Sequence, residues 1–226
     1  MAGVVMRTAN IDWSEIDTVF LDMDGTLLDL NFDNHFWQQH VPKRYAEKQG
    51  ITVEQARQDL FPRFRQEEGT MNWYCIDFWS RELGLDIALL KQEVDHLIAV
   101  HPHVTDFLDA LRQAGKQVLL VTNAHMKSLE LKMQKTQLAG HFDQLVCAHD
   151  YGVPKENSDF WGRLSLKINY DAARTLLVDD SLAVLRSARG YGIAYLLAIL
   201  QPDTQGPVKD VEEFMAIHHF IEIMPS

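Results

Sequence analysis

The chain has 226 residues, more than one domain of average size and fewer than two. Hydrophobic residues make up 46% and charged residues 23%, which is ordinary for a globular protein and excludes a disordered chain. The net charge of −11 argues against binding to a nucleic-acid polymer, because an acidic surface repels a polyanion. A small anionic substrate remains compatible with this charge if a cation and a lysine make its site locally positive.

No segment has the roughly 20 consecutive apolar residues of a membrane span, and residues 1–10 lack the apolar run of a signal peptide. We therefore expect a cytoplasmic protein without a membrane partner. The two cysteines, Cys75 and Cys147, lie far apart in the chain, each beside apolar neighbours. We expect both to be buried, reduced thiols and not parts of a disulfide or a metal site.

Five short apolar runs predict buried strands, because each run is continuous and is bounded by polar or turn residues. They are residues 18–21, 117–121, 144–148, 175–178 and 193–198. Helical patterns separate them. The first runs from Phe107 to Leu111 and ends before Gly115, the second carries Leu129 to Leu138, and the third covers residues 182–189. Strands that alternate with helices predict an α/β fold, a Rossmann-like parallel sheet covered on both faces.

Residues 29–100 interrupt this alternation, because they are far more than one crossover helix needs. They are rich in aromatic residues with helical spacing. We expect a helical cap domain here, inserted into a core that is formed by residues 1–28 and 101–226. Most of its aromatic residues should form the core of that domain. The tail, residues 201–226, holds three of the seven prolines and predicts a surface extension with a helix near residues 211–217.

The first candidate site motif is Asp22-Met23-Asp24-Gly25-Thr26, directly after the first predicted strand. Two carboxylates at a strand's end can turn toward one crevice, and Gly25 permits the tight turn between them. Such a pair suits metal binding, nucleophilic attack or acid/base catalysis. The alternative is a solvated acidic loop at the start of a helix.

Three more motifs follow later strands. Thr122-Asn123 could hold phosphate oxygens with a hydroxyl and free backbone N–H groups, or could cap a helix. Lys155 could balance phosphate charge, or could be an ordinary surface lysine. Asp179-Asp180 places two acids side by side, which is unfavourable unless a cation lies nearby. Taken singly, each motif has a structural explanation.

The positions of these motifs favour a common site. Asp22, Thr122 and Asp179 each come at the carboxyl end of a predicted parallel strand, and Lys155 lies in a loop after another. The carboxyl ends of parallel strands form the edge at which ligands bind in open α/β sheets. One site at this edge is a simpler explanation than four independent helix caps.

These residues, in this order, resemble the haloacid dehalogenase-type hydrolase superfamily. Its first motif corresponds to Asp-Met-Asp-Gly-Thr-Leu, its second to Thr122, its third to Lys155 and its fourth to Asp179-Asp180. In this chain Lys155 is followed by Glu156, where the superfamily frequently has proline.

The resemblance implies a magnesium-dependent phosphatase. Asp22 would be the nucleophile, and Asp24 the acid and base. Thr122, Asn123 and Lys155 would hold the phosphate, with Lys155 offsetting charge on the nucleophile. Mg²⁺ would be held by the Asp22 carboxylate, the Asp24 carbonyl and Asp179, with Asp180 in support.

A closer resemblance, to bacterial purine 5′-nucleotidases of this superfamily, implies GMP and IMP as substrates. It runs nearly from end to end, through DMDGTLLDLNFDNHFWQQ, NWYCIDFWSRELGLDI, LLVTNAHMKSLELK, YGVPKEN and RTLLVDDS. Aromatic rings could stack on a purine base, and Trp37, Trp73 and Trp79 are candidates for this role.

A haloacid dehalogenase is disfavoured because its reaction does not need an acid at Asp24. A phosphonatase would need a Schiff-base lysine from the cap, and no sequence feature identifies one. A sugar-phosphate phosphatase or a phosphomutase stays open, because the four motifs do not report on the leaving group. A non-catalytic binding scaffold is the alternative from a different class, although every catalytic position carries the required residue type.

Overall fold

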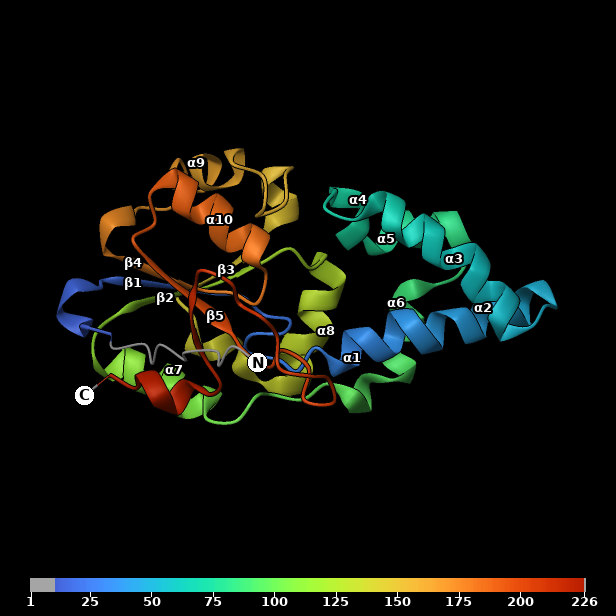
Figure 1. Cartoon of the computed structure of the whole chain (residues 1–226), viewed down its shortest axis with the longest axis horizontal. Helices are drawn as coiled ribbons and strands as arrows, with labels where there is room; N and C mark the ends of the chain where they lie inside the picture. The colour runs from blue at the N-terminus through green and yellow to red at the C-terminus, as the bar shows by residue number, and fades with distance from the viewer. Residues whose placement is uncertain (1–10, 226) are drawn as a thin grey trace, which may run out of the picture.

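The computed structural model describes residues 11–225 and shows an α/β core with a helical arm at one side (Figure 1). Six parallel strands form one sheet in the order β3-β2-β1-β4-β5-β6. The strands are β1 Thr18–Leu21, β2 Gln117–Thr122, β3 Gln144–Cys147, β4 Thr175–Val178, β5 Tyr195–Ile199 and β6 Met215–Ile217. This confirms the predicted Rossmann-like parallel sheet. The expectation about residues 1–10 lies outside the described residues.

The central strand β1 shows why these segments form strands. All four of its residues are buried. Val19 and Leu21 point to one face of the sheet and Phe20 to the other, so that a continuous apolar run satisfies both faces.

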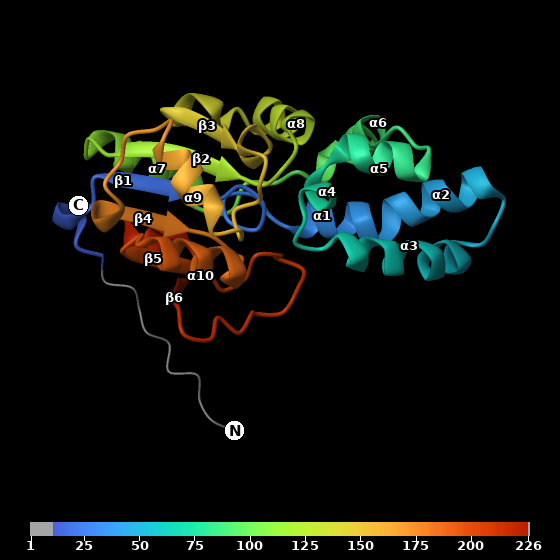
Figure 2. The same ribbon diagram turned by 90° about the horizontal axis from the view of Figure 1, so that it is seen from above.

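Helices cover both faces of this sheet, with α9 and α10 above it and α7 below it in Figure 1. Apolar residues of α7 Val104–Gln113 and α8 Met126–Thr136 pack on the face that holds Val19. Those of α9 Asp159–Ser165 and α10 Leu182–Tyr191 pack on the face that holds Phe20. Figure 2 shows this arrangement from above, with the carboxyl ends of the strands directed toward the helical arm.

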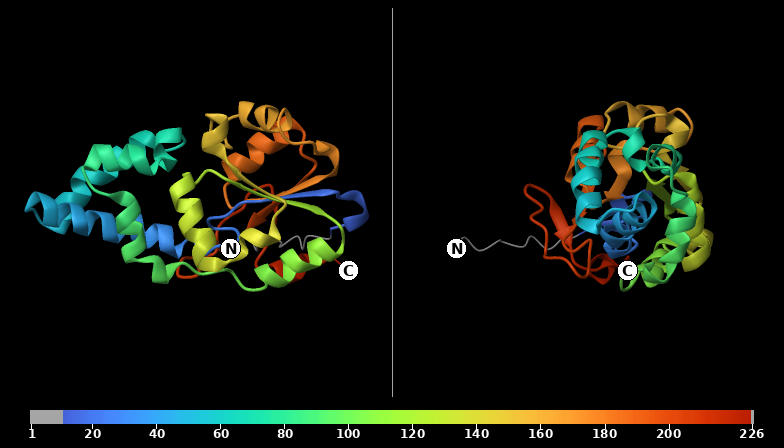
Figure 3. Two further views of the ribbon diagram at one scale, coloured as in Figure 1. Left: turned by 180° about the vertical axis from the view of Figure 1, so that it is seen from behind. Right: turned by 90° about the vertical axis from the view of Figure 1, so that its right-hand side faces the viewer.

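The helical arm is formed by the chain between β1 and β2, and we call residues 29–100 the insertion. Its helices are α1 Asn31–His35, the π-helical segment Phe36–His40, α2 Val41–Gln49, α3 Val53–Glu67, α4 Met71–Tyr74, α5 Ile76–Leu83 and α6 Ile87–Glu93. They surround a separate apolar core that includes Leu60, Phe64 and Trp79. Two views in Figure 3 show the insertion beside the sheet and not over either of its faces.

Two adjacent chain segments join the insertion to the core. Leu28 and Val100 form an isolated antiparallel bridge. Beside it, the backbone N–H of Asp29 donates to the carbonyl of Ala99 at 2.9 Å, and that of His101 to the carbonyl of Leu27 at 2.9 Å. The insertion therefore leaves and re-enters the core at one place.

The prediction for the tail is wrong. Residues 215–217 form strand β6 against β5, and the turn Phe220–Ile223 buries Phe220 and Ile223 in the core. The ring of Phe220 lies 4.8 Å from that of Phe107 on α7. The three residues of this strand are too few to produce a recognisable alternation in the sequence.

Smaller differences concern element ends. Helix α8 ends at Thr136, because Gln137 adopts a left-handed conformation with φ 59°, so Leu138 belongs to the following 3₁₀ turn and not to the helix. The fifth strand covers residues 195–199 where 193–198 were predicted. Cys147 is buried as predicted, whereas Cys75 is partly exposed. Within residues 11–225, no helix combines the length and apolar character that crossing a membrane requires.

Candidate active site

Three carboxylates, those of Asp22, Asp179 and Asp180, meet where β1 and β4 end. These strands are neighbours in the sheet, and Leu21 pairs with Val178, so Asp22 and Asp179 leave the sheet at the same level. One carboxylate oxygen from each of the three acids lies within 4.8 Å of the others. Asp22 and Asp179 are 6% and 1% exposed. The structure thus brings together acids that are distant in the sequence.

The side chain of Lys155 joins two of these acids. Its Nζ donates to Oδ1 of Asp22 at 2.5 Å, to Oδ2 of Asp179 at 2.7 Å and to the carbonyl of Val121 at 2.9 Å. The lysine is 2% exposed, so it is not the ordinary surface lysine that the sequence alone also allowed. All three of its donor positions are used within the site.

The carboxylates are held in an environment that disfavours their charge. Burial raises the pKa of Asp22 to about 6, and it also raises the pKa values of Asp179 and Asp180. Burial would lower the pKa of Lys155, but the carboxylates of Asp179 and Asp22 outweigh that effect and raise it. Lys155, together with Lys209 near Asp180, cannot neutralise three ionised carboxylates, so these acids carry an excess of negative charge when all are ionised.

A hard divalent cation fits this set of donors. Mg²⁺ prefers oxygen ligands and is held in many sites by only one or two carboxylates. Asp22, Asp179 and Asp180 offer carboxylate oxygens close together, and their unbalanced charge is what a cation would neutralise. The chemistry of the residues present is therefore compatible with magnesium.

Thr122 and Asn123 lie at the end of β2, beside β1. Neither residue caps α8, whose N-cap is His125. The hydroxyl of Thr122 accepts a hydrogen bond from the backbone N–H of Ala124 at 3.0 Å. Oδ1 of Asn123 accepts from the backbone N–H of Lys155 at 2.8 Å, so Asn123 positions the loop that carries the lysine.

The residue after Lys155, Glu156, also belongs to the site. It accepts a hydrogen bond from Nδ2 of Asn123 at 2.8 Å and one from the hydroxyl of Tyr74 at 2.7 Å. Tyr74 ends helix α4 of the insertion, so this contact links the insertion to the core. Glu156 is the residue at which the chain departs from the superfamily's frequent proline, and that departure was the only sequence signal for it.

The side chain of Asp24 lies apart from the three grouped carboxylates. Its Oδ1 accepts a hydrogen bond at 2.5 Å from Nζ of Lys132 on α8. The same nitrogen donates at 2.5 Å to Asp33 of the insertion, and Asp33 also pairs with Lys91 at 2.7 Å. Burial raises the pKa of Asp24 to about 6, although Lys132 opposes the shift. This value suits a group that must both give and take a proton near neutral pH.

Lys132 was missed by sequence reasoning, although a signal was present. It is 1% exposed and lies on the buried face of α8 together with Leu129 and Met133. A lysine at the helical spacing of an apolar face requires a buried partner. That observation could have identified Lys132, but not Asp24 and Asp33 as its partners.

The first motif requires a glycine at position 25 because the side chain of Asp180 leaves no room for a Cβ atom there. Gly25 has φ +82°, and a Cβ atom at this position would lie 2.8 Å from Cγ of Asp180. Any other residue would therefore push Asp180 away from Asp22 and strain the backbone.

The tryptophans considered for base stacking lie in the insertion. Trp79 is 2% exposed and packs inside the core of the insertion, so it cannot stack on a ligand in this conformation. Trp37 and Trp73 are partly exposed but also pack against that core. Tyr74, an aromatic residue that was not among the candidates, does contact the site loop.

Comparison with known proteins decides the family. A model of the haloacid dehalogenase-like hydrolases matches residues 16–192. The chain belongs to this family. The curated relatives include GMP/IMP nucleotidase YrfG of Escherichia coli (strain K12), which is 40% identical over 217 residues, 96% of this chain and 98% of the relative. They also include 6-phosphogluconate phosphatase of the same organism, 25% identical over 188 residues, 80% of this chain and 81% of the relative. The predicted family and the prediction of a phosphatase are confirmed.

Solved structures show the same fold. A haloacid dehalogenase-type phosphatase from Thermococcus onnurineus superposes with a TM-score of 0.75 at 21% identity, covering 92% of this chain and 96% of that one. L-2-haloacid dehalogenase from Xanthobacter autotrophicus superposes with a TM-score of 0.59 at 18% identity, covering 84% of this chain and 80% of that one. Proteins whose names give different reactions thus share this architecture, and a fold alone does not fix the substrate.

Proposed function

We propose that this family member is a magnesium-dependent phosphomonoester hydrolase that acts on the purine 5′-nucleotides GMP and IMP. The reaction is supported above all by the contact of Lys155 with both Asp22 and Asp179, which unites residues from three separate motifs. The substrate class is supported by 40% identity to a relative named GMP/IMP nucleotidase, over nearly the full length of both chains.

In the first step, a carboxylate oxygen of Asp22 attacks phosphorus, and the bond between phosphorus and the nucleoside 5′-oxygen breaks. Asp24 gives its proton to the departing oxygen, so the nucleoside leaves as a neutral alcohol. The phosphoryl group remains on Asp22 as an aspartyl-phosphate. In the second step, Asp24 takes a proton from water, and the oxygen of that water displaces the Asp22 carboxylate to give inorganic phosphate.

Other residues position the phosphoryl group and balance its charge. Lys155 would offset charge on Asp22 and on the phosphoryl oxygens, and Thr122 with the backbone of Asn123 would hold those oxygens. Asp22, Asp179, Asp180 and the carbonyl of Asp24 would hold Mg²⁺. When bound, Mg²⁺ supplies positive charge that stabilises the phosphoryl oxygens in the transition state.

The insertion would act as a cap over this site. It leaves the core through two adjacent segments, and it contacts the site loop through Tyr74 and the Asp24 network through Asp33. A cap that closes on the substrate excludes water and selects the leaving group. Two unpaired cysteines fit a reducing compartment, so we also propose a cytoplasmic location.

A sugar phosphate is the second candidate substrate. It is favoured by the 25% identity to a relative named 6-phosphogluconate phosphatase. Phosphate release from GMP, IMP, AMP, pyrimidine nucleotides and sugar phosphates, compared as kcat/KM at saturating Mg²⁺, tests the two assignments. We expect GMP and IMP to be preferred at least tenfold. A sugar phosphate preferred by that factor would refute the purine assignment.

A further inference from the structure

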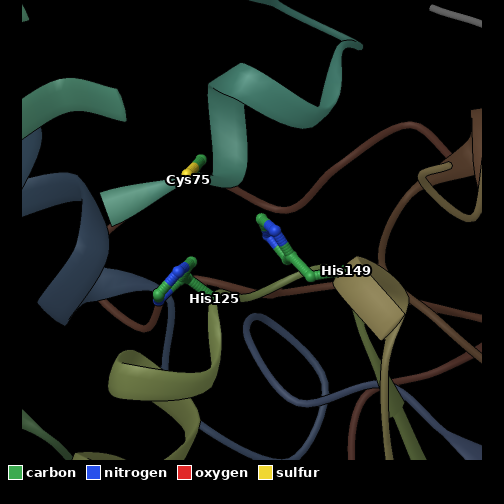
Figure 4. A group of neighbouring side chains, drawn as sticks. All are labelled: Cys75, His125 and His149. Carbon is green, nitrogen blue, oxygen red and sulfur yellow. The ribbon is translucent and has the colours of Figure 1, made fainter. Parts of the chain in front are cut away.

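A second group of potential metal ligands lies between the insertion and the core. Cys75 comes from the insertion, between α4 and α5, whereas His125 and His149 come from the core (Figure 4). One ligand atom from each of the three side chains lies within 4.8 Å of the others. The proposed hydrolysis of phosphate esters uses none of the three.

The three side chains make few interactions that would compete with a ligand, although the carboxylate Oδ2 of Asp77 lies 3.8 Å from Nε2 of His125. The thiol sulfur of Cys75 accepts one hydrogen bond, from the backbone N–H of Phe78 at 3.4 Å. Nδ1 of His125 accepts one from the backbone N–H of Lys127 at 3.3 Å. Nε2 of His149 is buried and makes no hydrogen bond within residues 11–225. A buried polar atom without a partner is unfavourable, and a ligand at this position would relieve that.

The histidines are in the protonation state that a metal needs. Burial lowers the pKa values of both His125 and His149, which favours the neutral form of each ring. The rings lie 5.0 Å apart between centroids with an angle of 80° between their planes. The rings are therefore not stacked, and one nitrogen of each lies within 4.8 Å of the other and of the Cys75 sulfur.

We propose that Cys75, His125 and His149 bind Zn²⁺, and that the bound ion holds the insertion against the core and slows turnover. One thiolate and two imidazoles are a typical ligand set for Zn²⁺, with water in the fourth position of a tetrahedron. Zinc bond lengths of about 2.0–2.3 Å place neighbouring ligand atoms about 3.3–3.7 Å apart. Because the present separations are no more than 4.8 Å, the ligand atoms must approach one another by at most about 1.5 Å.

This site would select a different ion from the carboxylate site. Thiolate and imidazole ligands favour Zn²⁺ and other transition metals, whereas Mg²⁺ prefers oxygen. An excess of Mg²⁺ would therefore occupy the group around Asp22 without competing at Cys75. Binding also has a cost, because a metal on either nitrogen of His125 removes the hydrogen bond from Lys127. That bond is long, so the cost is small.

The position of the site explains why it would affect catalysis. Cys75 directly follows Tyr74, whose hydroxyl donates to Glu156 of the site loop. His125 is two residues from Asn123, which positions Lys155. A metal bond from Cys75 to the two histidines would fix the insertion in this closed contact. Product release needs the insertion to move away, so the ion would lower kcat. This consequence rests on the proposed function, whereas metal binding itself does not.

The binding test uses the full chain, freed of metal, reduced and then saturated with Mg²⁺. We expect it to bind one Zn²⁺ per chain. Co²⁺ in its place should give the charge-transfer absorption of a thiolate–cobalt bond, which a carboxylate site cannot produce. In Cys75→Ser and His149→Gln, that absorption should be lost or strongly reduced and the Kd for Zn²⁺ should rise about tenfold or more. His96→Ala, which removes an exposed histidine of the insertion, is the matched control and should bind as the unchanged protein does.

Absence of the charge-transfer absorption in the unchanged protein would overturn the proposal, whatever the variants do. So would Zn²⁺ affinity that is the same in Cys75→Ser as in the unchanged protein. Cys75→Ser keeps an oxygen that can accept from Phe78, so loss of the helix cap does not confound this comparison.

The inhibition test measures kcat with a generic phosphate ester, so it does not depend on the purine assignment. Zn²⁺ should lower kcat of the unchanged protein and of His96→Ala at saturating Mg²⁺, and should leave that of Cys75→Ser at its metal-free level. Equal inhibition of Cys75→Ser, relieved by more Mg²⁺, would place the effect at the carboxylates and contradict the regulatory role. If neither protein hydrolyses the ester, the proposed function fails, while the cobalt spectrum still decides the metal site.

Discussion

Nζ of Lys132 lies 2.5 Å from Oδ1 of Asp24, and the same nitrogen lies 2.5 Å from Oδ2 of Asp33 in the insertion. One buried ammonium group therefore contacts both the proposed catalytic acid and the proposed cap. Its pKa is raised because Asp24 and Asp33 together outweigh the effect of burial, so it stays charged. Movement of the insertion would change the charge around Asp24, and we propose that this contact couples closure to proton transfer.

Replacing Lys132 tests this coupling. Lys132→Met leaves Asp24 and Asp33 without their shared cation, so the pKa of Asp24 should rise above its present value of about 6. We expect the acid limb of the kcat profile to move to higher pH and kcat at pH 7 to fall about tenfold or more. Stability should fall by about 3 kcal/mol, because a buried ion pair is broken on one side. The exposed Lys135→Met on the same helix is the control, and an unchanged pH profile in Lys132→Met would contradict the coupling.

The cluster of Asp22, Asp179 and Asp180 should destabilise the metal-free protein at neutral pH. Burial raises the pKa of Asp180 well above its unfolded value, so between these two values the folded state holds more protons than the unfolded state. The contribution of Asp180 to the free energy of unfolding is therefore lost as the pH rises from about 4 through the pKa that Asp180 has in the folded state. Asp180→Asn, which carries no charge, should then have a higher Tm than the unchanged protein at pH 8 without metal, and the same Tm near pH 4. Mg²⁺ should reduce or reverse the difference at pH 8. A lower Tm for Asp180→Asn at pH 8 without metal would show that the ionised Asp180 carboxylate does not destabilise the fold.

Magnesium should be required for turnover and should stabilise the fold. A chelator should abolish hydrolysis, and added Mg²⁺ should restore it. Mg²⁺ at 100 times its Kd should add about 2.7 kcal/mol to the free energy of unfolding. Asp179→Asn should need at least about tenfold more Mg²⁺ for half-maximal activity, measured at constant ionic strength. Full activity of the chelated protein would contradict the assignment of the carboxylates to a metal.

The C-terminal turn should contribute to the core. Phe220 is 2% exposed and packs against Phe107, so Phe220→Ala should lower the free energy of unfolding by about 3–5 kcal/mol. The neighbouring Ile221 is 54% exposed, and Ile221→Ala should change it by less than about 0.5 kcal/mol. Denaturant unfolding of both variants measures the difference. Equal stability of the two variants would mean that the turn is peripheral, as the sequence alone suggested.

The sequence allowed the sheet and much of the site to be predicted, because both follow from local patterns. Strand β1 is a continuous apolar run, and Asp22 and Asp179 follow adjacent parallel strands whose ends must meet. The contacts of Asp24, Tyr74 and Cys75 could not be predicted in this way. Each depends on how the insertion lies against the core, and no spacing within one segment reports that. The sixth strand was missed because an edge strand of three residues has too little pattern to recognise.

The central claim is that Asp22 becomes phosphorylated. Rapid acid quenching of the enzyme with ³²P-labelled substrate, followed by proteolysis and mass spectrometry, tests it directly. We predict a phosphoryl group on Asp22 that hydroxylamine releases, as it does from acyl phosphates. The label should be absent in Asp22→Asn, whose hydrolysis should fall at least about a thousandfold without loss of fold. Phosphate release by Asp22→Asn at the rate of the unchanged protein, or a label on another residue, would contradict the account.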